Sequence, residues 1–172
     1  TGTHVSSHNS RGIVAISRAN HQINHDDVAR AIEAARAGAL PSNREILHVI
    51  PRFYIVDGQE GVPDPVEMYG FRLEVEAHIV TASATALRNI ERCLKQANIE
   101  VREMVAAPLA AAEAVLSQDE KEMGVVVADI GGGTTGICIY LDGSPLHTAV
   151  LGVGGTHVTN DLTVGLRLPY NI

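Results

Sequence analysis

The chain has 172 residues, of which 45% are hydrophobic and 19% are charged, so it can bury a core as one domain or as two small ones. A formal net charge of −7, without any basic cluster, argues against a nucleic-acid-binding surface. No apolar run approaches the length needed to span a membrane. Cys93 and Cys138 have no metal-ligating neighbours in the sequence, which predicts buried thiols in a reducing compartment.

The first part of the chain predicts a strand followed by a helix. Gly12 to Arg18 is a short strand candidate. Asn24 can cap the helix that follows, because its side chain can accept a main-chain N–H and because Asp26 and Asp27 favour the first turn. Gly38 can end this helix. Its apolar face consists of Val28, Ala31, Ile32 and Ala35.

Two further strands are predicted before the next helix. Residues 44–56 form a strand pattern interrupted at Pro51, which indicates a bulge or a sheet edge. Residues 57–68 are expected to form a loop. Residues 71–79 then alternate strictly between apolar and polar side chains, which predicts a sheet covered on one side only. Its polar face is either a solvated surface or a protein interface.

The segment from residue 83 to residue 124 links this sheet to the second half of the chain. Ser83 can cap a helix whose apolar stripe runs from Leu87 to Ala97. Residues 99–105 are expected to form a short strand. Pro108 begins an alanine-rich helix, as proline favours the first turn. Residues 117–124 are expected to form a charged turn.

The most informative stretch is residues 125–140. An apolar strand pattern enters three glycines, two threonines follow, and a second strand pattern runs from Ile137 to Leu141. Asp142 and Gly143 offer a tight turn before another strand, from Ala149 to Val153. The sequence therefore predicts two successive hairpins with a glycine-rich first turn.

This glycine turn has the composition of an anion-binding loop. Three glycines let a ligand approach the backbone, and their N–H groups with the threonine hydroxyls suit phosphate oxygens. Asp129, at the end of the strand, can hold a hydrated Mg²⁺. The loop is not a Walker A motif, because no lysine follows the glycines and a strand follows in place of a helix. The alternative is a structural hairpin whose glycines merely allow a sharp bend.

A second glycine pair, Gly154 and Gly155, stands immediately before a predicted helix with Val158, Leu162 and Leu166 on one face. A helix N-terminus can offer free N–H groups and the positive end of its dipole to an anion. The alternative is a simple turn at the entry to the helix.

The pattern ADIGGGTT resembles the second phosphate loop of the actin-like ATPases. Residues 46–83 are similar to the segment that spans the small inserted domain of one family in this superfamily, bacterial FtsA. THVSS near the start, residues 106–135 and GGTHVTNDL extend the resemblance over essentially the whole chain. The first residue is not Met and the last residues follow a helical pattern, so we expect a fragment of a longer protein.

The resemblance implies an α/β (α+β) fold, a fragment of the actin-like ATPase fold. A small strand–helix–strand–strand inserted domain would precede the start of the second actin-like subdomain. The expected boundaries are 1–11 for the end of the first subdomain, 12–98 for the inserted interaction domain, 99–123 for the return through the first subdomain, and 124–172 for the truncated second subdomain with its phosphate loop.

The resemblance also implies a function. The family suggests a cytoplasmic ATP-binding adaptor that self-assembles and helps to tether the FtsZ ring to the inner face of the cell membrane at the division site. The implied cofactors are ATP and Mg²⁺. The implied partners are further copies of the protein, other division proteins through residues 12–98, FtsZ through a region outside this chain, and the membrane through a C-terminal helix outside this chain, with no role for nucleic acid.

Residue by residue, the resemblance places one set of side chains and peptides at the β- and γ-phosphates and Mg²⁺: Asp129, Gly131, Gly132, Gly133, Thr134 and Thr135, with Asp129 holding the metal through water. Gly154 and Gly155 would be second-tier contacts. The family pattern has Asp after the paired threonines, where this chain has Gly136. No catalytic residue is assigned, because the water-positioning group and charge clamp of phosphoryl transfer are not found. At most weak ATPase activity is expected in the parent protein.

Other interpretations remain open at this point. An actin-like pilus-assembly ATP-binding protein shares the layout with an inserted domain, whereas a chaperone-type ATPase lacks that domain at this position. A third possibility is a non-catalytic interaction module, in which residues 12–98 bind a partner and the glycine hairpin is structural.

Overall fold

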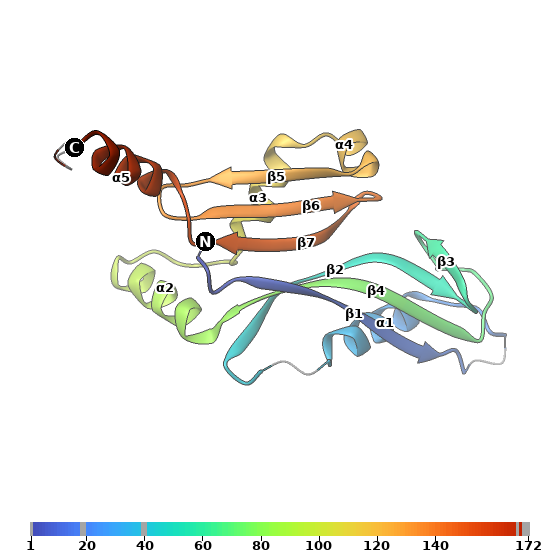
Figure 1. Cartoon of the computed structure of the whole chain (residues 1–172). Helices are drawn as coiled ribbons and strands as arrows, with labels where there is room; N and C mark the ends of the chain where they lie inside the picture. The colour runs from blue at the N-terminus through green and yellow to red at the C-terminus, as the bar shows by residue number, and fades with distance from the viewer. Residues whose placement is uncertain (1, 18–19, 39–40, 168, 170–172) are drawn as a thin grey trace.

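The computed structural model describes residues 2–17, 20–38, 41–167 and 169. These residues form a four-stranded antiparallel sheet in the order β1-β4-β2-β3 and a three-stranded antiparallel sheet in the order β5-β6-β7. Figure 1 shows the smaller sheet lying over the larger one, with α5 beside the turn between β5 and β6. The elements are β1 (Ser6–Ala15), α1 (His25–Arg36), β2 (Arg44–Val56), β3 (Gln59–Val62), β4 (Arg72–Ser83), α2 (Ala84–Gln96), α3 (Ala107–Val115), α4 (Gln118–Met123), β5 (Val125–Ile130), β6 (Thr135–Leu141), β7 (Ser144–Leu151) and α5 (Gly155–Leu166).

The first helix begins where the sequence predicts. The Asn24 side chain accepts a hydrogen bond from Asp27 N at 3.0 Å, and the Asp27 carboxylate accepts one from Asn24 N at 3.1 Å, which is a complete capping box. Gly12 lets α1 lie directly on β1, because a Cβ at Gly12 would stand 2.0 Å from the Ala31 carbonyl oxygen. The strand expected over 12–18 runs instead over Ser6–Ala15, and Arg18, like Thr1 and residues 170–172, lies outside the described residues.

The second strand has the irregularity that Pro51 indicates. The register of β2 against β4 shifts between Pro51 and Phe53, and again between Ile46 and His48. The expectation of a plain loop over 57–68 was wrong in part, because β3 forms within it. Asp57 and Gly58 both adopt positive φ, at 49° and 89°, and turn the chain back on itself as a hairpin.

The fourth strand corrects the prediction of a sheet covered on one side. Leu73, Val75 and Ala77 pack with α1, as the alternation predicts, but Val80 and Ala82 on the other face are also fully buried. The smaller sheet and α3 cover that second face, and a single strand cannot reveal a layer contributed by residues far along the chain. Glu74 is nearly buried as well, and its carboxylate is paired with Arg72 at 2.7 Å and with Arg11 at 3.5 Å.

A buried polar contact joins β4 to the smaller sheet. Asn9 Nδ2 donates to the Leu146 carbonyl oxygen, which fixes the orientation of the amide, so Asn9 Oδ1 accepts from His78 Nδ1 at 2.7 Å. His78 Nε2 then accepts from the Thr148 hydroxyl at 3.0 Å. The Ser7 hydroxyl also donates a hydrogen bond to the Thr148 carbonyl oxygen and accepts one from the Thr148 N–H. The two sheets are therefore joined by hydrogen bonds as well as by apolar packing.

Other predictions have mixed outcomes. Ser83 caps α2 and Pro108 stands in the first turn of α3, as expected. Cys138 is buried, but Cys93 is exposed because only the Leu87 end of the α2 stripe is covered. Residues 99–105 form no strand within the described chain. The expected charged turn is the short helix α4, which a Ser117–Glu120 capping box begins. The last strand starts earlier than expected, at Ser144.

The burial of His78 predicts that stability depends on pH. Burial, together with the nearby charges of His147, Arg52 and His8, lowers the pKa of His78 to about 4. The unfolded chain therefore binds protons first as the pH falls below about 6.5, so stability is complete above that pH and is lost toward pH 4. We expect a decrease of up to about 3 kcal/mol in the free energy of unfolding, measured by denaturant titration at pH 7.5 and 4.5.

In His78→Asn the slope of stability against pH should become shallower. It should not vanish, because burial also lowers the pKa of His48. His25→Gln, at an exposed position, should keep the wild-type slope. An unchanged slope in His78→Asn would contradict the assignment.

Candidate functional site

The glycine turn between β5 and β6 is a four-residue loop. Ile130 pairs with Thr135, and Gly131 N donates to Thr134 O at 2.9 Å, which closes the loop across its base. Gly131, Gly132 and Gly133 are all exposed. The loop therefore presents its backbone to solvent at one end of the smaller sheet.

The middle of this loop does not require glycine for its own fold. The backbone of the loop glycines lies outside the left-handed region. A Cβ at Gly132 would make only an ordinary contact, 3.7 Å from Thr156 Oγ1, and a Cβ at Gly133 would meet nothing within 4 Å. Open space in front of the backbone is what an approaching ligand needs.

The structure brings the two predicted glycine segments together. Gly155 N donates to Gly131 O at 2.9 Å, and Thr156 N donates to Gly132 O at 2.8 Å. A Cβ at Gly154 would stand only 2.5 Å from Gly131 O, so this position has to be glycine. Figure 1 shows the start of α5 beside the β5–β6 turn.

The two threonines of the loop differ in their surroundings. The Thr135 hydroxyl donates to Val153 O at 2.7 Å, so its proton is engaged within the protein, and its lone pairs remain. Thr134 is half-buried, and its carbonyl oxygen accepts the bond that closes the loop. Sequence reasoning missed Thr156 and the Val153 carbonyl, because their role depends on how α5 packs against a loop more than 20 residues earlier.

Asp129 lies on β5 opposite Gly136 and is half-buried. It shares its face of the strand with Val125 and Val127, which pack against the core that includes α3. No group of three His, Cys, Asp or Glu side chains suited to a metal occurs among the described residues. A metal at Asp129 would therefore need water or a phosphate for its other ligands, which is how Mg²⁺ is commonly held.

Gly136 stands where the first turn of α3 meets β6. A Cβ at Gly136 would lie 2.8 Å from Pro108 Cγ and 3.5 Å from Pro108 Cβ. This contact gives a packing reason for glycine in place of the Asp of the family pattern. Any side chain here would push the start of α3 away from the sheet.

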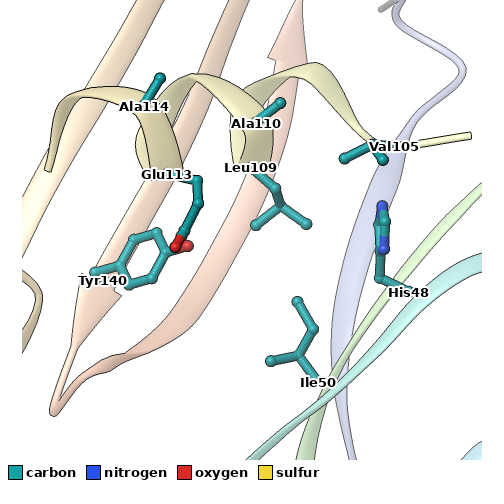
Figure 2. Close-up of a pocket in the computed structure, with 8 residues that line it drawn as sticks. All are labelled: His48, Ile50, Val105, Leu109, Ala110, Glu113, Ala114 and Tyr140. Carbon is teal, nitrogen blue, oxygen red and sulfur yellow. The ribbon is translucent and has the colours of Figure 1, made fainter.

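A separate groove lies at the other end of the smaller sheet, between α3 and β2. Figure 2 shows Leu109 and Ile50 facing one another across it, with Glu113 beside the Tyr140 ring. Two of its polar side chains are engaged: His48 Nε2 accepts from Ala106 N at 3.0 Å, and Glu113 is paired with Lys121 at 2.7 Å. Burial raises the pKa of Tyr140 to about 12, so its hydroxyl stays protonated. This groove carries no reactive group.

Sequence profiles of two protein families match the chain. The profile described as "SHS2 domain inserted in FTSA" matches residues 2–81, and that of "Cell division protein FtsA" matches residues 126–171. The chain is also similar in fold to a chain of the PilM-PilN type IV pilus biogenesis complex, with a TM-score of 0.60 and 17% identity over 95% of this chain and 45% of that one. The fold is that of a fragment of an actin-like protein, in which the larger sheet belongs to the inserted SHS2 domain.

Curated relatives are similar over nearly the whole chain. Cell division protein FtsA of Pseudomonas aeruginosa is 45% identical over 98% of the chain, that of Bacillus subtilis is 42% identical over 96%, and that of Escherichia coli is 34% identical over 98%. The chain belongs to the FtsA family. It spans 40%, 38% and 40% of the length of these relatives. Within the part that the structure describes, no helix has the length and apolar character to cross a membrane.

The packing of Gly136 against Pro108 predicts a specific cost. Gly136→Ala should lower the free energy of unfolding by about 1–3 kcal/mol, because the added methyl group overpacks the junction. Pro108→Ala removes the ring atom that lies 2.8 Å from the added Cβ, so the double variant should recover part of the loss. Denaturant titration measures all four proteins of this cycle.

Gly133→Ala is the matched control, because its Cβ would meet nothing within 4 Å. Its stability should stay within about 0.5 kcal/mol of wild type. If Gly136→Ala destabilised the protein equally with and without Pro108, the contact between residues 136 and 108 would not be the cause of the lost stability.

Proposed function

We propose that this chain contributes the phosphate-binding part of an ATP site in a cell-division adaptor. The observation that carries the proposal is the exposed backbone of Gly132 and Gly133, for which neither φ nor packing requires glycine. Glycine at such positions is explained by a ligand that approaches the backbone closely. The proposed contacts are Gly131, Gly132, Gly133 and Thr134, with Thr135 at the base of the loop, Asp129 holding Mg²⁺ through water, and Gly154 and Gly155 behind the loop.

The proposed role of ATP is to favour assembly of the adaptor, which helps to tether the FtsZ ring to the cytoplasmic face of the membrane. Membership of the FtsA family supports this role. FtsZ and the membrane would be contacted by regions outside this chain, whereas residues 12–98 would contact further copies or other division proteins. We assign no catalytic residue, and at most weak ATP hydrolysis is proposed.

Two exposed aromatic side chains support an interaction surface in the segment that leads into β4. Tyr69 is 70% exposed and Phe71 is 66% exposed, and the Phe71 ring lies 4.3 Å from the His21 imidazole. Exposed aromatic residues are enriched at protein interfaces, where they bury a large area at small entropic cost. Glu74 is a poorer candidate, because it is nearly buried and engaged in ion pairs.

Binding of Mg-ATP to the full-length protein tests the phosphate site. In Gly132→Val, a branched side chain would stand where the phosphate lies, so calorimetry should show a loss of binding of at least about a hundredfold, or about 2.7 kcal/mol. Gly165→Val, in α5 where a Cβ also meets nothing within 4 Å, should bind like wild type. Binding that survives unchanged in Gly132→Val would make the glycines structural.

The same titration with and without Mg²⁺ tests the proposed metal role. Asp129→Ala should weaken Mg-ATP more than metal-free ATP. Equal losses would assign Asp129 a structural role and remove the metal from the proposal.

Self-association tests the aromatic surface. Tyr69→Ser with Phe71→Ser should weaken ATP-dependent assembly of the full-length protein about thirtyfold or more in sedimentation assays, because interface aromatics each carry about 1–2 kcal/mol. Met123→Ser is the control, since Met123 is 78% exposed at the end of α4 on the other half of the fold. Assembly that is equally weakened by both changes would not support this surface.

A further inference from the structure

The start of α5 and the glycine loop are joined by hydrogen bonds that run in one direction. Gly155 N and Thr156 N, at the N-terminus of α5, donate to the carbonyl oxygens of Gly131 and Gly132. Gly154 N donates to His157 Nδ1 at 3.1 Å. The N–H groups that open the helix are therefore occupied by the protein itself, chiefly by the loop.

These bonds fix the direction in which the loop peptides point. A trans peptide holds its C=O and N–H on opposite sides, and no cis peptide occurs in the described chain. Because the carbonyl groups of Gly131 and Gly132 point toward α5, the N–H groups of Gly132 and Gly133 point away from it. No acceptor among the described residues takes either N–H. Successive N–H groups on one side of a loop form an anion-binding concavity.

We infer that α5 is the element that orients the phosphate loop, and that Thr135 and Gly154 are positioning residues for it. This inference rests on the proposed function and adds how the site is held. The N–H groups of Gly155 and Thr156 do not donate to the anion themselves. They polarise and orient the loop peptides, whose own N–H groups then donate to the anion. The positive end of the α5 dipole lies behind peptides whose N–H groups face the ligand.

Thr135 and Gly154 secure this arrangement from its two sides. The Thr135 hydroxyl ties the base of the loop to Val153, one residue before the N-cap of α5. Gly154 has no side chain, which lets the helix come close enough for its N–H groups to reach the loop, since a Cβ would stand 2.5 Å from Gly131 O and 2.6 Å from Gly132 O. The ligand that this loop would bind is an anion with terminal phosphate oxygens.

The test compares binding of Mg-ATP with binding of adenosine, which lacks phosphate, to the full-length protein by calorimetry. Thr135→Val should weaken Mg-ATP about tenfold and leave adenosine unchanged, because only the orientation of the phosphate loop is lost. Thr135→Ser, which keeps the hydroxyl, should restore Mg-ATP binding. Gly154→Ala should weaken Mg-ATP at least as much as Thr135→Val, although its methyl group faces the loop carbonyls and not the ligand.

Thr163→Val is the matched control. It removes a threonine hydroxyl that bonds Asn160 O at 2.7 Å within α5, away from the loop, and it should bind both ligands like wild type. Wild-type protein that binds no Mg-ATP would overturn the proposed function and this inference with it. Wild-type binding with undiminished affinity in Thr135→Val and Gly154→Ala would overturn the inference alone. A parallel loss of adenosine and Mg-ATP, or failure of Thr135→Ser to restore binding, would likewise overturn it.

Discussion

The burial of β4 on both of its faces is the constraint on which the rest of this fold depends. The strand pairs with β1 along one edge and with β2 along the other, and it contributes to both apolar cores. The core on one face is closed by α1 and the core on the other by α3 and β6. Because Leu73 and Val80 point to opposite faces, a shift of one residue in register would exchange the two cores. The strand β4 therefore determines the positions of both the larger sheet and the glycine hairpin.

The hydrogen bonds around His78 fix how the two packed sheets are aligned. Apolar surfaces can slide over one another at little cost, whereas the Asn9, His78 and Thr148 side chains match donor to acceptor in only one alignment. Ser7 bonds the backbone of the same Thr148. The smaller sheet is thus held at a fixed position on β1 and β4, and the loop at its far end is carried on a rigid support.

Local signals predicted most elements, and distant contacts account for much of what was missed. The Asn24 cap, Pro108, and the Asp142–Gly143 turn each depend on a few neighbouring residues, and the structure confirms them. The Asp57–Gly58 turn was equally local and was taken for a loop. The second buried face of β4 depends on residues more than 20 positions away, which no alternation pattern records. In the site, both glycine segments were predicted, but their mutual bonding was not, and their role in binding stays a prediction.

The contact between Ser7 and Thr148 has a consequence for how the chain is made. Its two residues are separated by 141 positions, so the ribosome must add most of this chain before β1 meets β7. At bacterial rates of synthesis this takes on the order of ten seconds. During that time β1, an edge strand of its sheet, exposes unpaired N–H and C=O groups to other nascent chains. Its sequence from Ser6 to Arg11, SSHNSR, is wholly polar, which disfavours aggregation through that edge.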